Sequence, residues 1–163
     1  MLINSLMYIN YLNFPTIPLP LILNTELIVN TNIYTLPNLK TLFFKTSGIN
    51  DELHQWLKVN IPFEFAHVRY QVIYKGITPH KDSTDRVTAI TYLLDTGGEN
   101  VATTVFDDFG NVLQSKTIVE RKWHYLTTHL THTVTGATFN KPRVAISIDS
   151  PELYSYFTKF VCD

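Results

Sequence analysis

The sequence has little cysteine and little net charge, and each shortage narrows what the protein can be. Its one cysteine is Cys162, so no disulfide can form within the chain, which suits a reducing compartment and leads us to expect a cytoplasmic protein. The net charge is −1 with histidine neutral, so no broad electrostatic field attracts nucleic acid or an anionic membrane. We therefore expect neither of them as a partner.

The sequence also lacks an uninterrupted apolar run near its N-terminus. No Lys or Arg precedes Lys40, and the apolar residues 1–23 are broken by Pro15, Pro18 and Pro20. A signal peptide needs a positively charged start and an unbroken apolar core, and a membrane-spanning helix needs about 20 apolar residues. We predict neither here, because an edge strand or a packed extended arm fits this segment better.

What the sequence does have is enough apolar material for a folded core. Apolar residues make up 45% of the 163 residues and aromatic residues 13%, which argues against intrinsic disorder. The length fits one domain of ordinary size. We expect a single domain, residues 1–163, in which residues 63–149 form the core. Residues 1–62 would support it with strands and a helix, and residues 150–163 would end in a helix.

Short strand-like segments dominate the sequence after Pro62. They are rich in Phe, Val, Ile and Tyr, recur about every ten residues and are separated by turn residues such as Gly97 and Gly98. This spacing predicts a mainly β fold, a sandwich, jelly roll or barrel, rather than a parallel α/β sheet. The six segments are residues 63–74, 86–95, 100–108, 112–120, 122–130 and 142–149.

Three further segments have recognisable local patterns. Residues 25–36 carry β-branched and apolar side chains, which predicts a strand or hairpin. Residues 51–58 follow an Asn suited to helix capping and place Leu53 and Leu57 on one face, which predicts a short helix. Residues 150–160 have a proline near their start and predict a terminal helix.

A His and an Asp lie one residue apart, at His80 and Asp82, in a turn-rich segment that precedes a strand-like run. Residues i and i+2 of an extended chain project to the same side, so both side chains could grip one ion. Two ligands make a poor site, and a third must come from elsewhere in the chain. Two His and one carboxylate with the other positions open suit non-haem Fe(II). On its own, the pair fits a solvated turn better than a metal site.

His132 and Arg143 supply what that pair lacks. Arg143 follows His132 by eleven residues and opens an apolar strand-like segment, where a positive charge needs a partner. The distal carboxylate of 2-oxoglutarate, whose other end chelates iron, wants a bidentate, permanently charged partner of this kind. Two alternatives stay open, because Arg143 could reach water from a strand edge and His129 could take the place of His132.

The remaining histidines predict no ligand. His67 lies in a strand-like run, one position out of phase with Tyr70 and Tyr74, and fits a barrel wall better than a metal site. His124 fits the surface of a strand, and His54 fits the face of the short helix. We therefore expect structural roles for all three.

Four residues carry a resemblance to a known family: His80, Asp82, His132 and Arg143. Together they resemble the motif of the Fe(II)/2-oxoglutarate-dependent dioxygenases, and within them the prolyl 4-hydroxylase-like branch. That motif is a His-x-Asp pair, a distant second His and then, some residues later, an Arg or Lys. The resemblance covers residues 68–149, and the combined spacing is far more specific than either part alone.

The resemblance implies a double-stranded β-helix, a jelly-roll barrel with a few short flanking helices and with iron at its open mouth. The two histidines and the aspartate of the motif would bind Fe(2+). Arg143 and Tyr92 would hold the far carboxylate of 2-oxoglutarate, with Tyr74 and Ser147 as further contacts. Both tyrosines also fit plain core positions. Dioxygen would be a substrate, and ascorbate is a candidate reductant.

The activity implied is hydroxylation of a peptidyl residue such as proline, with succinate and carbon dioxide formed from 2-oxoglutarate. The segment between Tyr74 and His80 is short and leaves little room for a lid that clasps a peptide. The same chemistry on a free amino acid or a small metabolite is therefore the first alternative. A jelly-roll module of cupin type that binds metal without turnover is the second, and it would need no role for Arg143.

Overall fold

A computed structural model describes most of the chain. The described residues are 8–30, 44–65, 67–82, 87–138, 140–152 and 154–161. The prediction for residues 31–36 and the one that concerns Cys162 lie outside these ranges. None of the helices in the described ranges is long and apolar enough to cross a membrane.

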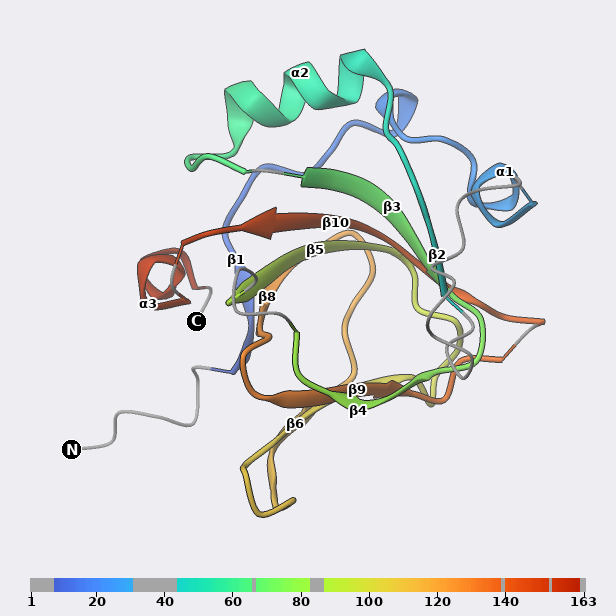
Figure 1. The fold of residues 1–163 in the computed structure, drawn as a ribbon. Coiled ribbons are helices and arrows are strands. Elements are labelled where there is room, and N and C mark those ends of the chain that lie inside the picture. Colours follow the sequence, from blue (N-terminus) through green and yellow to red (C-terminus); the bar gives the residue numbers. More distant parts are fainter. Residues whose placement is uncertain are drawn as a thin grey trace.

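The described strands form two antiparallel sheets that face each other (Figure 1). The larger sheet contains, in spatial order, β1 (Ile9–Leu12), β8 (Trp123–Thr127), β5 (Thr88–Asp95), β10 (Arg143–Ser150), β3 (His67–Ile73) and β2 (Phe44–Ser47). The smaller sheet contains β4 (Ile77–His80), β9 (Thr131–Thr135), β6 (Ala102–Phe106) and β7 (Val112–Lys116).

As it runs from β3 to β10 the chain passes from one sheet to the other at every step except from β6 to β7. Strands β3, β5, β8 and β10 lie in the larger sheet, and β4, β6, β7 and β9 lie in the smaller one. Two facing antiparallel sheets that share consecutive strands in this way form a jelly roll. The prediction of a mainly β jelly roll with a few short flanking helices is therefore confirmed.

The main hydrophobic core lies on the face of the larger sheet that points away from the smaller sheet, which we call the outer face. Successive side chains of a strand point to opposite faces, so every second residue contributes to it. Trp123 and Ile146 are buried there together with Leu53 and Leu57 from α2 (Asp51–Asn60). Figure 1 shows α2 lying across this side of the sheet. The outer face is thus a sheet-on-helix core.

The opposite face of the larger sheet, which we call the inner face, looks toward the smaller sheet. Leu93 and Ala145 pack there against Val105 of the smaller sheet, and this second cluster is much smaller than the first. The neighbouring inner-face positions hold polar residues, among them Thr91 and Ser147, both nearly inaccessible to solvent. The space between the sheets is therefore lined by polar as well as apolar side chains.

Most of the elements predicted from the sequence are present. Each of the six predicted strand segments contains one strand, and the helix predicted over 51–58 is α2. It begins after Asn50, whose side chain accepts a hydrogen bond from the Leu53 amide at 2.8 Å. β1 is an edge strand that pairs with β8, as the N-terminal segment predicted. The terminal helix is shorter than predicted and consists of α3 (Tyr154–Phe157) and one 3-10 turn, η2 (Thr158–Phe160).

The strand predicted over residues 25–36 is wrong where the structure describes it. Thr25–Asn30 form the helix α1, preceded by the short 3-10 turn η1 (Leu19–Leu21). The Asn24 side chain accepts from the Glu26 amide at 2.8 Å, which starts a helix, and Ile28 is the one fully buried side chain. Local capping and one-sided burial outweigh the β-branched composition here.

Candidate metal centre

The smaller sheet brings together the three residues predicted to bind metal. His80 ends β4 and pairs with His132 on β9, so the two rings lie side by side. Asp82 follows β4 by two residues, and its backbone amide donates to the Thr128 carbonyl at 3.0 Å. The Thr133 hydroxyl donates to the Ile77 carbonyl and fastens the start of β4 to β9. Residues about fifty positions apart in sequence are therefore placed by backbone pairing.

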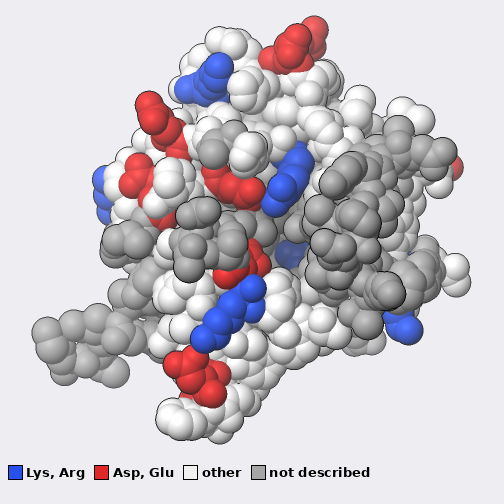
Figure 2. All heavy atoms as spheres, viewed as in Figure 1, with Lys and Arg blue, Asp and Glu red and all other residues white. Residues whose placement is uncertain are grey.

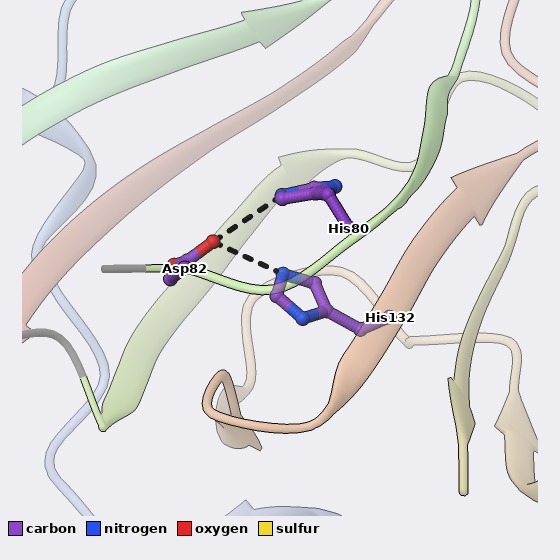
Figure 3. Close-up of side chains that lie close together, drawn as sticks. All are labelled: His80, Asp82 and His132. Carbon is purple, nitrogen blue, oxygen red and sulfur yellow. Dashed lines mark ion pairs between the residues drawn. The ribbon is translucent and has the colours of Figure 1, made fainter. Parts of the chain in front are cut away.

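Asp82 lies to one side of the two imidazole rings and faces both of them (Figure 3). Its Oδ1 is 3.2 Å from Nε2 of His80 and 3.4 Å from Nε2 of His132. One ligand atom of each residue lies within 4.8 Å of the other two. His132 is buried and the side chain of Asp82 is only 9% exposed, whereas the side chain of His80 is 35% exposed, so the group opens toward solvent on the side of His80.

The protons on the two rings can be assigned from their other contacts. Nδ1 of His80 lies 2.8 Å from the Thr78 carbonyl, and Nδ1 of His132 lies 2.8 Å from the Leu130 carbonyl. A carbonyl oxygen only accepts, so each Nδ1 carries a proton and donates it. In a neutral ring, Nε2 then presents a lone pair to the carboxylate oxygen of Asp82. Two lone pairs facing an anionic oxygen repel unless a cation lies among them.

A first-row transition metal fits this group of donors. Ligand atoms about 2.1 Å from one ion lie ~3.0 Å apart at an octahedral angle and ~3.4 Å apart at a tetrahedral one. The separations of 3.2 and 3.4 Å fall at or near these values. The hydrogen bonds at Nδ1 fix the orientation of both rings, as outer partners of metal-binding histidines do. The three residues could hold a metal ion, and two His with one carboxylate is the donor set of non-haem iron sites.

Arg143 is buried in the space between the two sheets. It is the first residue of β10, is 5% exposed, and donates from Nη1 to the Thr103 hydroxyl at 3.2 Å. Thr103 lies two residues along β6 from Val105, which pairs with His132. Two residues along a strand span about 7 Å, so the guanidinium reaches the same inner space as the metal group.

The alternative of a solvent-reaching Arg143 is excluded by this burial. Burial lowers the pKa of Arg143 to about 10, which leaves it charged at neutral pH. Within the part of the chain that the structure describes, no carboxylate forms an ion pair with it. A buried guanidinium without such a partner is costly, so this position favours an anionic ligand.

The structure does not bring Tyr92 to Arg143, which contradicts the predicted role of Tyr92. Tyr92 is fully buried on the outer face, with its ring 5.0 Å from that of Trp123. Leu93, the next residue, is the one that lines the space beside Arg143. Because side chains alternate along a strand, the two neighbours face opposite sides. The hydroxyl of Tyr92 is buried beside the backbone of Ile17, and burial raises its pKa.

Tyr74 also lies away from the metal group. Its hydroxyl donates to the Val29 carbonyl of α1 at 2.8 Å, so it fastens α1 to the sheet. Ser147 is buried on the inner face and shares that face with Arg143. The two are four positions apart on β10, which is about 13 Å along a strand. The contact predicted between Ser147 and the carboxylate held by Arg143 therefore stays a prediction.

The other histidines differ in how exposed they are, and none of those described below belongs to the metal group. His129 is exposed, and the metal group contains His132 instead. His67 is exposed at the start of β3. His124 was predicted on a strand surface, which is wrong, because it is 2% exposed and lies on the inner face between the sheets. The sequence signal was its position between Trp123 and Tyr125, whose alternation places the residue between them on the opposite face.

Two spaces open near Arg143. The first is too small to admit a water molecule and is bounded by Arg143, Thr103, Leu93, Thr96, Val101 and Ile118. The second, of about 910 Å³, shares Thr96 and Ile118 with it and opens between the loops of residues 95–100, 117–120 and 136–141. Its carboxylates, Asp95, Glu99 and Glu120, disfavour anions there. It lies at the Asp95 end of β5, whereas Asp82 contacts Thr128 near the other end.

The charged side chains on the face seen in Figure 2 are mixed in sign. Lys and Arg lie next to Asp and Glu across this view. An ion pair joins Lys81 to Asp108 at 2.9 Å. Lys81 stands between His80 and Asp82 in the chain. The pair therefore connects the metal-binding segment to the turn that follows β6.

Comparison with known proteins identifies a fold neighbour without identifying a family. No family model and no curated protein matches the chain. Among solved structures, the crystal structure of a cupin superfamily protein from Desulfitobacterium hafniense DCB-2 is similar, with a TM-score of 0.42 and 14% sequence identity. The match covers 85% of this chain and 95% of that chain.

Proposed function

We propose that this protein is an Fe(II)- and 2-oxoglutarate-dependent dioxygenase. The observation that supports the proposal is the joint placement of two His Nε2 atoms, one carboxylate oxygen and a buried arginine in one jelly roll. Two His and one carboxylate leave ligand positions open for a chelating co-substrate and for dioxygen. A buried arginine that no described carboxylate pairs with provides a counter-charge for the far end of a dicarboxylate.

The residues of the chain have separable tasks in this proposal. His80, Asp82 and His132 would hold the metal, which supplies the redox chemistry when it is bound. Arg143 would orient the co-substrate by binding its distal carboxylate. The apolar side chains between the sheets, among them Leu93, would keep water away from that carboxylate.

The substrate proposed first is a peptidyl residue such as proline, following the family resemblance. The exposed side of His80 is the open side of the group, so a substrate would approach from there. A free amino acid or a small metabolite is the alternative, because the residues between Tyr74 and His80 are few. Peptide arrays treated with the metal-loaded protein and scored for a mass gain of one oxygen atom test the first choice. Free amino acids treated in the same way test the second.

The test of the proposed activity is succinate formation that depends on Fe(II), dioxygen and 2-oxoglutarate. His132→Ala is expected to abolish it and to weaken metal binding by more than the ~10–100-fold that loss of an outer partner costs. Arg143→Met should also abolish it, while metal binding is kept. The free energy of unfolding of Arg143→Met should rise by about 1 kcal/mol or more, because a desolvated cation is removed. Succinate formation that survives both substitutions would sink the assignment.

A metal-binding jelly roll without turnover is the second candidate function. Two observations favour it: the space beside Arg143 is too small to admit a water molecule, and Tyr92 does not contribute to it. Isothermal titration of the metal-loaded protein with 2-oxoglutarate, without oxygen, separates the two candidates. Saturable binding that Arg143→Met removes supports the dioxygenase, and metal binding without 2-oxoglutarate binding supports the module.

A further inference from the structure

An ion pair lies on the inner face of the larger sheet. Arg69 of β3 is paired opposite Ser147 of β10, and Asp149 lies two residues further along β10. Residues directly opposite on paired strands point to the same face, as do residues two apart on one strand, so both charged side chains share the inner face with Ala145. Nη2 of Arg69 lies 3.1 Å from Oδ2 of Asp149. The inner face therefore carries a guanidinium in addition to that of Arg143.

This ion pair lies at the end of the larger sheet that is close to the metal group. The Asp149 end of β10 pairs with the start of β5. Val87, just before β5, accepts a hydrogen bond from the Thr128 amide, and the Thr128 carbonyl accepts one from the Asp82 amide. Arg143 is at the opposite end of β10, about 20 Å away along the strand. The ion pair and Arg143 therefore occupy different ends of the space between the sheets.

Strands β3 and β4 bring Arg69 and His80 to a similar depth on the two facing sheets. The chain passes from β3 to β4 through residues 74–76. Arg69 lies four positions before the end of β3, about 13 Å along the strand, and His80 lies three positions after the start of β4, about 10 Å. Facing sheets pack about 10 Å apart. A small molecule or a short peptide segment can therefore contact Arg69 and the metal group at once.

Arg69 is accessible to a solute, in contrast to Arg143. The side chain of Arg69 is 31% exposed and that of Asp149 is 17% exposed, whereas Arg143 is 5% exposed. A partly exposed ion pair contributes little to stability, so stabilisation of the fold does not explain this one. A guanidinium carries several N–H donors in one plane, and the contact with Asp149 occupies only one edge of it. Asp149 thus orients the guanidinium and leaves donors for a second carboxylate.

We propose that Arg69 determines substrate specificity by binding a carboxylate of the primary substrate, the molecule that is hydroxylated, with Asp149 as its positioning residue. This inference rests on the proposed function and deepens it, because the substrate then carries a carboxylate near the carbon that faces the metal. Two sources supply such a group: the α-carboxylate of a free amino acid, and the side-chain carboxylate of an acidic residue next to the target residue in a peptide. Either one matches the planar fork of the guanidinium.

The experiment compares paired probes that differ only in the charge of one group. The first series consists of the standard free L-amino acids and their amides. The second consists of acetylated and amidated tripeptides with a varied central residue and either Glu or Gln beside it. The readout is stimulation of succinate formation by the Fe(II)-loaded wild type with 2-oxoglutarate and oxygen. At least one carboxylate probe should have a KM about 10-fold or more below that of its amide partner, as expected for a hydrogen bond to a charged group. The series that responds identifies the source.

Substitutions at the ion pair test the residues assigned to it. Arg69→Gln should raise the KM of the responding carboxylate probe about 10-fold or more and remove the preference over its amide. Arg69→Lys keeps the charge without the planar fork and should restore part of the preference. Asp149→Asn should raise the same KM less, because it removes only the positioning contact. Lys58→Gln, at an exposed position of α2, removes one positive charge elsewhere and should leave the preference unchanged.

Each outcome decides for or against the inference. Equal KM values within every responding pair of probes, or stimulation by no probe at all, would overturn it even if the variants fail to fold, because the wild type alone gives this result. A preference that persists in Arg69→Gln, shown to be folded by circular dichroism, would overturn it as well. Anaerobic calorimetry of the Fe(II)-loaded wild type with 2-oxoglutarate tests the proposed function separately. Binding of 2-oxoglutarate leaves the proposed function standing in all these cases, and its absence overturns both.

Discussion

The two faces of the larger sheet differ in what they bury. The outer face packs aromatic and branched side chains such as Trp123, Tyr92 and Ile146 against α2 and the N-terminal segment. The inner face buries Arg143, His124 and a few threonines and serines beside a small apolar cluster. Both faces are almost inaccessible to solvent. The outer face consists of apolar groups, whose transfer out of water is favourable, whereas the inner face contains polar groups, whose transfer out of water is unfavourable.

This difference indicates which part of the jelly roll stabilises the fold. Polar groups buried between the sheets reduce stability, so the outer face must supply the surplus. Polar residues that would bind a ligand can lower the free energy of unfolding only because a separate core stabilises the fold. Substitutions on the outer face should therefore change unfolding, and substitutions on the inner face should change ligand binding or pH dependence.

The largest effect is expected for Trp123→Ala on the outer face. Trp123 is 1% exposed, its ring lies 5.0 Å from that of Tyr92, and its Nε1 donates to the Pro15 carbonyl at 2.9 Å. Removing it should lower the free energy of unfolding by about 3–5 kcal/mol. Urea unfolding measures the change. Phe109→Ala, at a side chain that is 90% exposed, is the control and should stay within about 0.5 kcal/mol.

A smaller effect, which depends on pH, is expected from His124 on the inner face. Burial and the charges of Arg143 and Lys116 hold its pKa at about 3, whereas an unfolded histidine has a pKa near 6.5. The unfolded state therefore binds a proton first as the pH falls. The stability that the neutral ring confers is complete above pH ~6.5 and is lost progressively toward pH ~3. From pH 7 to pH 5 the loss should be about 2 kcal/mol.

The measurement is urea unfolding of the wild type and of His124→Leu at both pH values. The variant should lose less stability than the wild type over this interval, by roughly the 2 kcal/mol assigned to the ring. His67→Gln should behave like the wild type, since His67 is exposed. Parallel pH profiles for the wild type and His124→Leu would contradict the burial of a neutral ring.

The smallest effect is expected for Tyr92→Phe, which sharpens the comparison between the faces. The hydroxyl lies on the outer face, so its loss should change the free energy of unfolding by no more than about 1 kcal/mol. Affinity for 2-oxoglutarate should not change, because the ring does not reach the inner space. A clear loss of 2-oxoglutarate affinity in a folded Tyr92→Phe protein would show that Tyr92 does contribute to 2-oxoglutarate binding.

The sequence predicts the elements better than it predicts the faces of their side chains. Alternation and turn residues indicated the strands, and the Asn50 cap indicated α2. The spacing of His80, Asp82 and His132 was enough to predict a group that the fold does assemble. These signals come from neighbouring residues or from a sequence motif, and the folded structure agrees with them.

The errors concern residues whose roles depend on which face of the sheet they occupy. Tyr92 and Leu93 are neighbours in sequence, and only pairing with β10 and β8 decides which of them lies between the sheets. His124 was misplaced for the same reason. β4 and β9 were not predicted as strands because their hydrogen bonds are made to each other, far apart in sequence, rather than encoded by an apolar alternation.

The place of β10 in the larger sheet has a kinetic consequence. It is synthesised after the other described strands, yet it lies between β5 and β3 in the middle of the sheet. Until it arrives, β3 and β2 have no sheet to join, and the pairing of β3 with β10 links residues as distant as His67 and Asp149. Non-local pairing of this kind folds slowly, over milliseconds to seconds. The nascent chain should therefore stay uncommitted until synthesis has passed residue 150, when one strand completes the sheet and delivers Arg143 to the interior.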